Sequence, residues 1–318
     1  MILISVSWVL KKTRCVNWFA GVRRFSILVQ IPNIRWLYTS ELFDRCLSDP
    51  AFLIEPLQSG LEGEVYKISW PAFHFSTVFK VWNRSSKQDP MKQLSVLQHL
   101  REFGVPVSEV YGCGYDDVGS PILVTSFDGR PLADSEGHDV AVFAKLLAQI
   151  HRLPANRFPL EIPDKATVFD RLIHYFFPSL SLHPDLQEAV HSIVPRITPM
   201  DVSVIHGDFN LGNIVHQGER YCILDWTNAQ VSDGRYDLAW AAFLIKIYMN
   251  DNVYHKFKES YFHERSMGSI DYPLFEMLGF LRWLLLHRMA NLPMKEDTFA
   301  KIKRFRDENK SILGGVVL

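Results

Sequence analysis

The sequence predicts an α+β fold in which a small β-rich lobe precedes a larger, mainly helical lobe. Up to about residue 128, alternating apolar and polar runs are separated by turn signals, whereas helical periodicity dominates the rest of the chain. The length of 318 residues suits two such lobes. Hydrophobic residues make up 47% of the chain and charged residues 22%, and these values exclude wholesale disorder.

The first forty residues differ from the rest of the chain in charge. They hold six basic residues and no acidic one, although the whole chain has a net charge of −1. Lys11 and Lys12 follow the apolar start instead of preceding it, which is the reverse of a secretory signal. We interpret residues 1–39 as an N-terminal extension, either appended or disordered. Two origins stay open: an organelle targeting segment, or a start codon assigned upstream of the true one.

Residues 40–128 form the predicted small lobe. Ser40 is placed to cap a short helix. Alternating runs on both sides of Trp70-Pro71-Ala72 predict an antiparallel hairpin. Pro90 opens a helix that Gly104 ends. In chain order, the predicted elements are a short helix before Pro50, a hairpin with strands in 56–69 and 75–82, a helix over 90–103, an extended segment 105–115 and a strand 121–127.

Residues 129–318 form the predicted larger lobe, with a short connection near residues 128–130. Residues 140–153 have strong helical periodicity, and the β-like interruption of the lobe spans residues 202–226. Further helices are predicted at 168–177, 185–195, 237–249, 273–290 and 296–310. The apolar run 274–292 contains charged side chains, so we expect a buried or amphipathic helix and not a membrane span.

The most specific polar pattern lies between residues 204 and 226. Residues 213–216 and 221–224 are β-like runs around a turn and predict a hairpin that brings Asn213 beside Asp225. A carboxylate and an amide oxygen are hard ligands that suit Mg²⁺. Asp208 lies one loop earlier, where its carboxylate can accept a proton from a hydroxyl group. The alternative interpretation is a buried polar hairpin whose acidic residues cap turns.

The order of these residues is typical of phosphoryl transfer. An aspartate, an asparagine five positions later and a second aspartate at a strand end occur in protein kinases, where metal ions and positioning stabilise spread negative charge. With its flanking residues, the block resembles the aminoglycoside phosphotransferase and choline kinase superfamily of small-molecule kinases. The resemblance covers about residues 50–250 and is carried by His206-Gly207-Asp208, Asn213, Leu224-Asp225-Trp226, Asp237-Leu238-Ala239 and the helix that ends at Leu147-Ala148-Gln149-Ile150-His151.

This resemblance implies a protein-kinase-like fold and a role for each matched residue. Asp208 is expected to be the catalytic base, and Asn213 and Asp225 are expected to be the magnesium ligands. His206 is expected to brace the loop without transferring protons. Asp237 is expected to steady the catalytic loop, although its place at the start of an apolar helix predicts N-capping on local grounds.

The nucleotide side of the predicted site is less specific. Gly60 and Gly63 lie in a turn that matches no complete phosphate-binding fingerprint, so a phosphate cover and a plain hairpin entry both stay open. Lys80 lies in an apolar strand and pairs with Val65 in the predicted hairpin. The resemblance implies that Lys80 binds ATP phosphates. Relatives place a glutamate on the next helix to pair with this lysine, but Gln93 occupies that spacing, so we expect Lys80 to lack that glutamate partner.

The predicted substrate is the hydroxyl group of a small molecule: an amino alcohol, a sugar or an aminoglycoside-like compound. Residues 131–318 have a net charge of −3 without an acidic run, so they lack the acid-rich pattern expected for a polycationic ligand. Aromatic residues of the larger lobe are interpreted as a box for a quaternary amine or, as is more common at helical spacing, as core. They are Tyr175, Phe176, Phe177, Trp240, Phe243, Tyr248, Tyr261, Phe262 and Trp283.

Composition also limits the partners. The near-neutral charge gives no electrostatic basis for nucleic acid binding, and no membrane partner is expected. The four cysteines are far apart and show no metal-binding spacing, which favours a reducing, cytoplasmic location.

We therefore predict an ATP- and Mg²⁺-dependent phosphotransferase that acts on a small-molecule hydroxyl. The alternative is a catalytically weak or inactive pseudokinase that binds a nucleotide or a partner. Gln93 and the incomplete glycine turn favour that alternative, whereas Asp208, Asn213 and Asp225 oppose it. A phosphotransferase with a protein acceptor is a further alternative, but the chain between Asp225 and Asp237 shows no evident activation segment.

Overall fold

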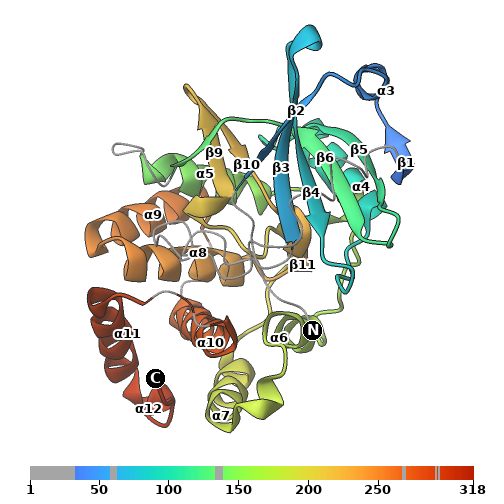
Figure 1. Cartoon of the computed structure of the whole chain (residues 1–318). Coiled ribbons are helices and arrows are strands. Elements are labelled where there is room, and N and C mark those ends of the chain that lie inside the picture. Colours follow the sequence, from blue (N-terminus) through green and yellow to red (C-terminus); the bar gives the residue numbers. More distant parts are fainter. Residues whose placement is uncertain (1–32, 58–62, 133–138, 267–269, 291, 293) are drawn as a thin grey trace. The chain divides into compact units, whose positions relative to one another are not determined.

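The computed structural model describes residues 33–57, 63–132, 139–266, 270–290, 292 and 294–318 (Figure 1). The described chain divides into two compact units. The N-terminal unit holds residues 33–132 and 212–227, and the C-terminal unit holds residues 139–211 and 228–318. The predicted α+β class is confirmed. The hairpin that carries Asn213 and Asp225 was expected in the larger lobe, residues 129–318, but residues 212–227 belong to the N-terminal unit.

The N-terminal unit is built on a six-stranded antiparallel sheet with the order β1-β5-β6-β4-β3-β2. Its strands are β1 (Arg35–Thr39), β2 (Leu53–Pro56), β3 (Gly63–Trp70), β4 (Phe75–Trp82), β5 (Val110–Tyr115) and β6 (Pro121–Ser126), and its helices are α3 (Glu41–Leu47) and α4 (Pro90–Glu102). Because β1 pairs with β5, residues 35–39 belong to the sheet and not to an extension. Residues 1–32 lie outside the described chain.

The alternation of β3 and β4 gives the sheet two different faces. On one face, Ile68, Trp70 and Phe79 are buried around Phe43 of α3. The Phe43 ring centroid lies 5.9 Å from that of Trp70 and 5.9 Å from that of Phe79. This aromatic core fixes the register of the two strands, since a shift by one residue would expose the buried set. The register therefore determines which side chains the opposite face presents.

A small three-stranded sheet completes the N-terminal unit, in the order β10-β9-β7. Its strands are β7 (Arg130–Pro131), β9 (Ile214–Gln217) and β10 (Arg220–Ile223). Gly129 precedes β7 with a φ of +110°, and a Cβ atom there would lie 2.1 Å from the carbonyl oxygen of His216. Only glycine fits this close approach, which attaches the connection near residues 128–130 to β9.

The C-terminal unit is mainly helical. Its helices are α5 (Val140–Ile150), α6 (Val168–Phe176), α7 (Pro184–Ile193), α8 (Gly234–Tyr248), α9 (Asp251–Glu264), α10 (Tyr272–Ala290), α11 (Glu296–Glu308) and α12 (Lys310–Leu313), and its short strands are β8 (Ser203–Ile205) and β11 (Gln230–Ser232). Nearly every residue of α8 is buried, and this helix packs against α9, α10 and α11. A helix that is apolar on almost all sides must lie in a core.

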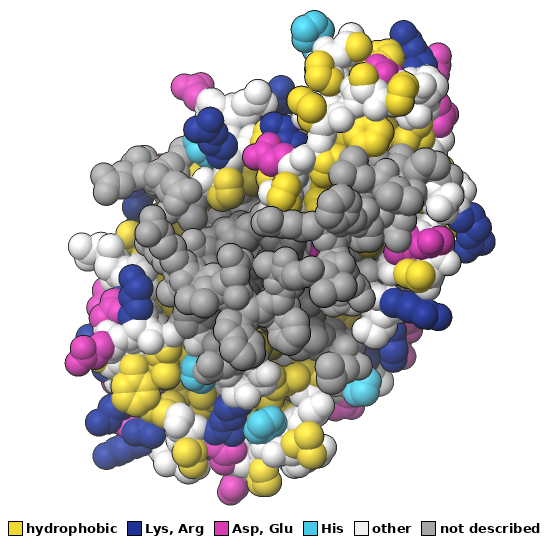
Figure 2. All heavy atoms as spheres, viewed as in Figure 1, with side chains coloured by type: hydrophobic (Ala, Val, Ile, Leu, Met, Phe, Trp, Pro, Cys, Tyr) yellow, Lys and Arg dark blue, Asp and Glu magenta, His cyan; other side chains and the backbone are white. Residues whose placement is uncertain are grey.

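The structure also bears on the expected apolar helix near residue 280 and on the charge of the surface. The apolar run near residue 280 forms α10, most of which is buried in the helical core. Within the described chain, no helix has both the length and the apolar character needed to cross a bilayer. On the described part of the face shown in Figure 2, basic and acidic side chains lie interspersed, so the charge balance of the sequence extends to this surface.

Candidate functional site

A cavity of about 570 Å³ lies within the N-terminal unit. The sheet face opposite the aromatic core contributes Val65 and Lys80, and α4 contributes Gln93. The hairpin contributes Asn213 and Asp225. This size is in the range of small-molecule and cofactor sites. The cavity therefore brings together four of the polar residues that the sequence analysis selected.

Lys80 and Asp225 form an ion pair at this cavity. The predicted pairing of Lys80 with Val65 is present in the β3–β4 register. The Nζ atom of Lys80 lies 2.6 Å from Oδ1 of Asp225, and the hydroxyl of Thr227 donates to the same oxygen. Lys80 therefore has Asp225 as an ion-pair partner. Gln93 does line the cavity, but Asp225 supplies the negative charge.

Asp225 is held in an unusual backbone conformation. Its φ is +63°, a left-handed value that aspartate adopts more readily than most residues. The N–H of Leu224 donates to the carbonyl oxygen of Asn213 at 2.7 Å, so the hairpin contact extends up to Asp225. The indole N–H of Trp226 donates to the carbonyl oxygen of Ile223 at 3.0 Å. These bonds fix a turn that directs the amide of Asn213 and the carboxylate of Asp225 to one cavity.

The donor set at the cavity fits a hard divalent cation. Asn213 and Asp225 offer an amide oxygen and carboxylate oxygens, the ligands that Mg²⁺ prefers. Within the described chain, no group of three or more His, Cys, Asp or Glu gathers to hold a metal. Gly63 begins β3 at the cavity, and Gly60 lies outside the described residues.

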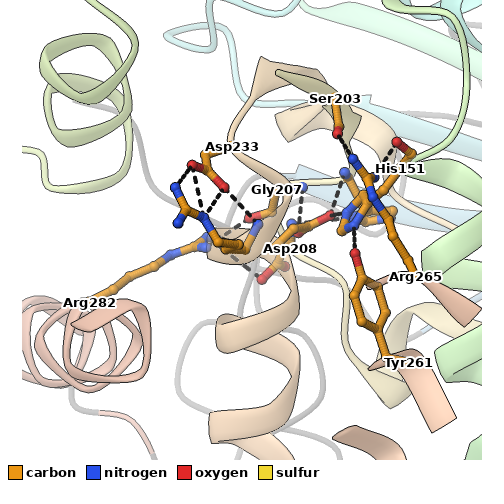
Figure 3. A network of polar contacts seen from close by, with 11 residues as sticks. His151, Ser203, Gly207, Asp208, Asp233, Tyr261, Arg265 and Arg282 are labelled. Atoms are coloured by element: carbon orange, nitrogen blue, oxygen red, sulfur yellow. Dashed lines mark hydrogen bonds and ion pairs between the residues drawn. The ribbon is translucent and has the colours of Figure 1, made fainter. Parts of the chain in front are cut away.

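Asp208 lies in the C-terminal unit, in the loop that follows β8 (Figure 3). Its side chain is buried, and the indole N–H of Trp240 donates to Oδ1 at 2.8 Å. The Asp208 backbone N–H donates to Nδ1 of His206 at 3.2 Å, and the amide of Asn210 donates to the Asp208 carbonyl oxygen at 2.9 Å. The loop thus holds the backbone of Asp208 through the side chains two residues before it and two residues after it.

Asp237 binds the same loop from α8. Its carboxylate accepts hydrogen bonds from the backbone N–H groups of His206 at 2.8 Å and Gly207 at 3.0 Å. The expectation that Asp237 caps the helix is wrong, because α8 begins at Gly234 and Asp233 accepts from the N–H of Arg235 at 2.9 Å. Asp237 is one turn further along, where it connects the helix core to the loop.

The charge of Asp237 is stabilised inside the core. Burial alone would raise the pKa of Asp237, but hydrogen bonds from His151 and the backbone, together with nearby histidines, lower it below its ordinary value. Burial lowers the pKa of His151, so this histidine is neutral at neutral pH. Its Nε2 lies 3.3 Å from Oδ2 of Asp237, and its Nδ1 lies 2.6 Å from the hydroxyl of Tyr261. A neutral imidazole that donates to Asp237 and accepts from Tyr261 satisfies both contacts.

Most of the aromatic residues suggested as a box for a quaternary amine are buried in the helical core, whereas Tyr175, Tyr248 and Phe262 are partly exposed. Phe176 and Trp240 lie against the guanidinium group of Arg282, and Tyr261 lies against His151. In the sequence, Arg282 is one of the charged side chains of the apolar run 274–292 that argue against a membrane span. The sequence feature that points to a role for Arg282 is a cation within an apolar run, because a charge that is buried there needs a partner.

The fold is that of kinase-like phosphotransferases. The family model described as "Phosphotransferase enzyme family" matches residues 53–272. The chain belongs to this family. A comparison with curated protein sequences gives no match.

Solved structures of small-molecule kinases have the same fold. A choline/ethanolamine kinase family protein from Mesorhizobium loti is 18% identical, with a TM-score of 0.57 over 85% of this chain and 94% of that chain. An amicoumacin kinase in complex with AMP-PNP, Ca²⁺ and Ami is 14% identical, with a TM-score of 0.59 over 87% and 95%. A thermostable mutant of aminoglycoside phosphotransferase APH(4)-Ia in a ternary complex with ADP and hygromycin B is 15% identical, with a TM-score of 0.59 over 85% and 95%.

Proposed function

We propose that the protein transfers the γ-phosphate of ATP to a hydroxyl group of a small molecule, such as an amino alcohol, a sugar or an aminoglycoside-like compound. The observation that carries this proposal is the cavity at which Lys80 and Asp225 pair beside Asn213. The cation and the amide and carboxylate oxygens are the groups needed to bind a metal–triphosphate. Bound AMP-PNP in the amicoumacin kinase and ADP in APH(4)-Ia support a nucleotide as the ligand.

Each residue has a defined task in this reaction. Lys80 binds phosphate oxygens, and Asn213 and Asp225 would hold Mg²⁺, which would neutralise part of the phosphate charge when bound. Asp208 accepts the proton of the acceptor hydroxyl as its oxygen forms a bond to the γ-phosphorus. The bond from the γ-phosphorus to the bridging oxygen breaks, and ADP leaves with that oxygen. The buried indole and backbone contacts of Asp208 keep its carboxylate in place for this step.

The second candidate function is a pseudokinase that binds a nucleotide without turnover. The neutral side chain of Gln93 on the cavity wall favours it, because Gln93 stands at the spacing where relatives place a glutamate to pair with the lysine. A protein acceptor is less well supported, because the stretch where an activation segment would be expected, between Asp225 and α8, consists only of residues 226–233.

A thermal-shift titration with Mg-ATP is the first test of this function. A ligand at 100 times its Kd stabilises the folded state by about 2.7 kcal/mol, so the wild-type protein should show a clear rise in Tm. Lys80→Met should lose most of this shift, because it removes the cation at the cavity. Lys92→Met is the matched control, since Lys92 is an exposed lysine on α4, and it should keep the full shift.

ATP consumption with a panel of amino alcohols, sugars and aminoglycosides then separates the two candidate functions. Acceptor-dependent release of ADP supports the phosphotransferase. A thermal shift without ADP release for any acceptor supports the pseudokinase. The absence of a shift at millimolar Mg-ATP contradicts both.

A further inference from the structure

We propose that Arg282 is a positioning residue for the candidate base Asp208. Together with Trp240, Arg282 keeps the carboxylate of Asp208 ionised and fixes its direction. The catalytic meaning of this proposal rests on the proposed function. The structural claim itself concerns contacts within the C-terminal unit alone.

The contacts of Arg282 converge on the loop of the candidate base. Arg282 lies in the middle of α10 and is 0% exposed. One terminal nitrogen, Nη1, donates to the carbonyl oxygen of Gly207 at 2.8 Å, and Nη2 lies 3.7 Å from Oδ1 of Asp208. The indole N–H of Trp240 donates to the same Oδ1 at 2.8 Å. Figure 3 shows the Arg282 side chain extending from its helix toward Gly207 and Asp208.

Aromatic rings surround the guanidinium group of Arg282. Its central carbon lies 4.0 Å from the ring centroid of Trp240, 4.5 Å from that of Phe176 and 5.8 Å from that of Tyr236. Such faces attract cations, and Arg282 itself occupies the space between them. A planar guanidinium suits this stacked position, whereas a lysine ammonium would lose the ring contact and part of the hydrogen-bond geometry.

The energetics of burial indicate that Arg282 serves Asp208. Nη1 of Arg282 donates to the Gly207 carbonyl oxygen, but within the described chain Nε and Nη2 have no hydrogen-bond partner, so the nearby carboxylate and the rings compensate the rest of its charge. An apolar side chain would fill the same aromatic surroundings without the cost of a buried charge. A buried carboxylate, by contrast, needs a nearby cation and an N–H donor to remain ionised. Arg282 and Trp240 supply one of each.

The other ionisable groups near this pair favour the same assignment. Tyr236 stays neutral, because burial raises its pKa far above the ordinary value. Asp237 adds negative charge nearby, but its carboxylate accepts from the backbone N–H groups of His206 and Gly207. The side chain of His206 accepts from the Asp208 N–H through Nδ1. Arg282 therefore brings the permanent positive charge to the base.

An NMR titration tests this role without nucleotide or acceptor. The indole ¹H–¹⁵N signal of Trp240, assigned through Trp240→Phe, reports the charge on Asp208 because its N–H donates to Oδ1. In the wild-type protein, the signal should show no inflection between pH 5 and 8 that arises from Asp208, that is, none that Asp208→Asn removes. In Arg282→Met, the inflection that arises from Asp208 should lie at a pH about one unit or more above its wild-type position, since a cation within a few ångströms lowers a carboxylate pKa by that amount. Arg282→Lys should restore much of the wild-type profile.

Arg235→Met is the matched control for the loss of a buried arginine. Arg235 is also almost fully buried and lies 4.6 Å from the Phe275 ring centroid, but its ion pair is with Asp233. This variant should lower Tm without moving the Trp240 titration. The acidic limb of kcat/KM against pH should move upward in Arg282→Met by the same amount as the NMR inflection.

The outcomes separate this proposal from the proposed function. If the inflection moves as expected but the wild-type protein has no turnover, Arg282 has the proposed role and the proposed function fails. If turnover is present and the inflection of Arg282→Met matches the wild type, the role of Arg282 is overturned. If Arg282→Met does not fold, an Asp208-dependent inflection between pH 5 and 8 in the wild-type protein alone overturns it.

Discussion

Asp208→Asn is expected to lower turnover by about 10²–10⁴-fold, because it removes the group that accepts the hydroxyl proton. Nucleotide binding should be nearly unchanged, since the cavity with Lys80 and Asp225 is built by the other unit of the chain. Asparagine has almost the same size as aspartate, so the hydrogen bond from Trp240 can be kept. The measurement is steady-state ADP release with an identified acceptor, together with a Mg-ATP thermal shift.

The control for this substitution is Asp201→Asn. Asp201 has a side chain that is 92% exposed and pairs with Lys165, so its loss should leave turnover and Tm close to wild type. Turnover in Asp208→Asn that stays close to the wild-type value would show that another group accepts the proton.

Asp237→Ala is expected to lower the free energy of unfolding by about 3–5 kcal/mol. The substitution leaves the backbone N–H groups of His206 and Gly207 and the Nε2 atom of His151 without their buried acceptor. Urea denaturation measures the loss, and Asp201→Ala is the exposed control. A loss below about 1 kcal/mol would mean that the loop does not depend on this carboxylate.

The stability contribution of Asp237 has a defined pH dependence. Its pKa is lowered from the ordinary value of 3.8 in the folded chain, so its contribution is complete above that value and is lost as the pH falls through the folded pKa. The wild-type protein should therefore lose stability below about pH 4 more steeply than Asp237→Ala. Equal acid dependence of the two proteins would contradict the lowered pKa.

Local patterns were sufficient to predict the hairpins of the candidate site. The β3–β4 pairing of Lys80 with Val65 follows from two alternating runs around a turn. The pairing of β9 and β10, and hence the meeting of Asn213 and Asp225, follows from the turn that contains Gly218. In both cases the partners are close in sequence, so the turn residues and the two-residue period define the register.

The helix α9 was not predicted, although its sequence contains the signal. Tyr254, Phe257 and Tyr261 are its buried residues and have the spacing of one helix face. The rest of the segment is polar, which hides this face when the apolar content is averaged. Packing of α9 against α5 and α8 supplies the stabilisation that its composition does not indicate.

The roles of Asp237 and Arg282 depend on contacts that are distant in sequence. Two aspartates, Asp233 and Asp237, lie near the start of α8, and local propensity does not determine which one caps the helix. The loop N–H groups that bind Asp237 come from residues 206 and 207, and the partner of Arg282 comes from a different element again. Only the tertiary structure brings these groups together.

Isothermal titration of ATP with and without Mg²⁺ into the wild-type protein and Asp225→Asn tests the central claim most directly. Binding to the wild-type protein should be strengthened by Mg²⁺, because Asp225 and Asn213 offer oxygen ligands at the cavity that Lys80 lines. Asp225→Asn should still fold but should lose most of the Mg²⁺ dependence. Absence of ATP binding to the wild-type protein, or equal Mg²⁺ dependence in both proteins, would contradict the assignment of this cavity as the metal–nucleotide site.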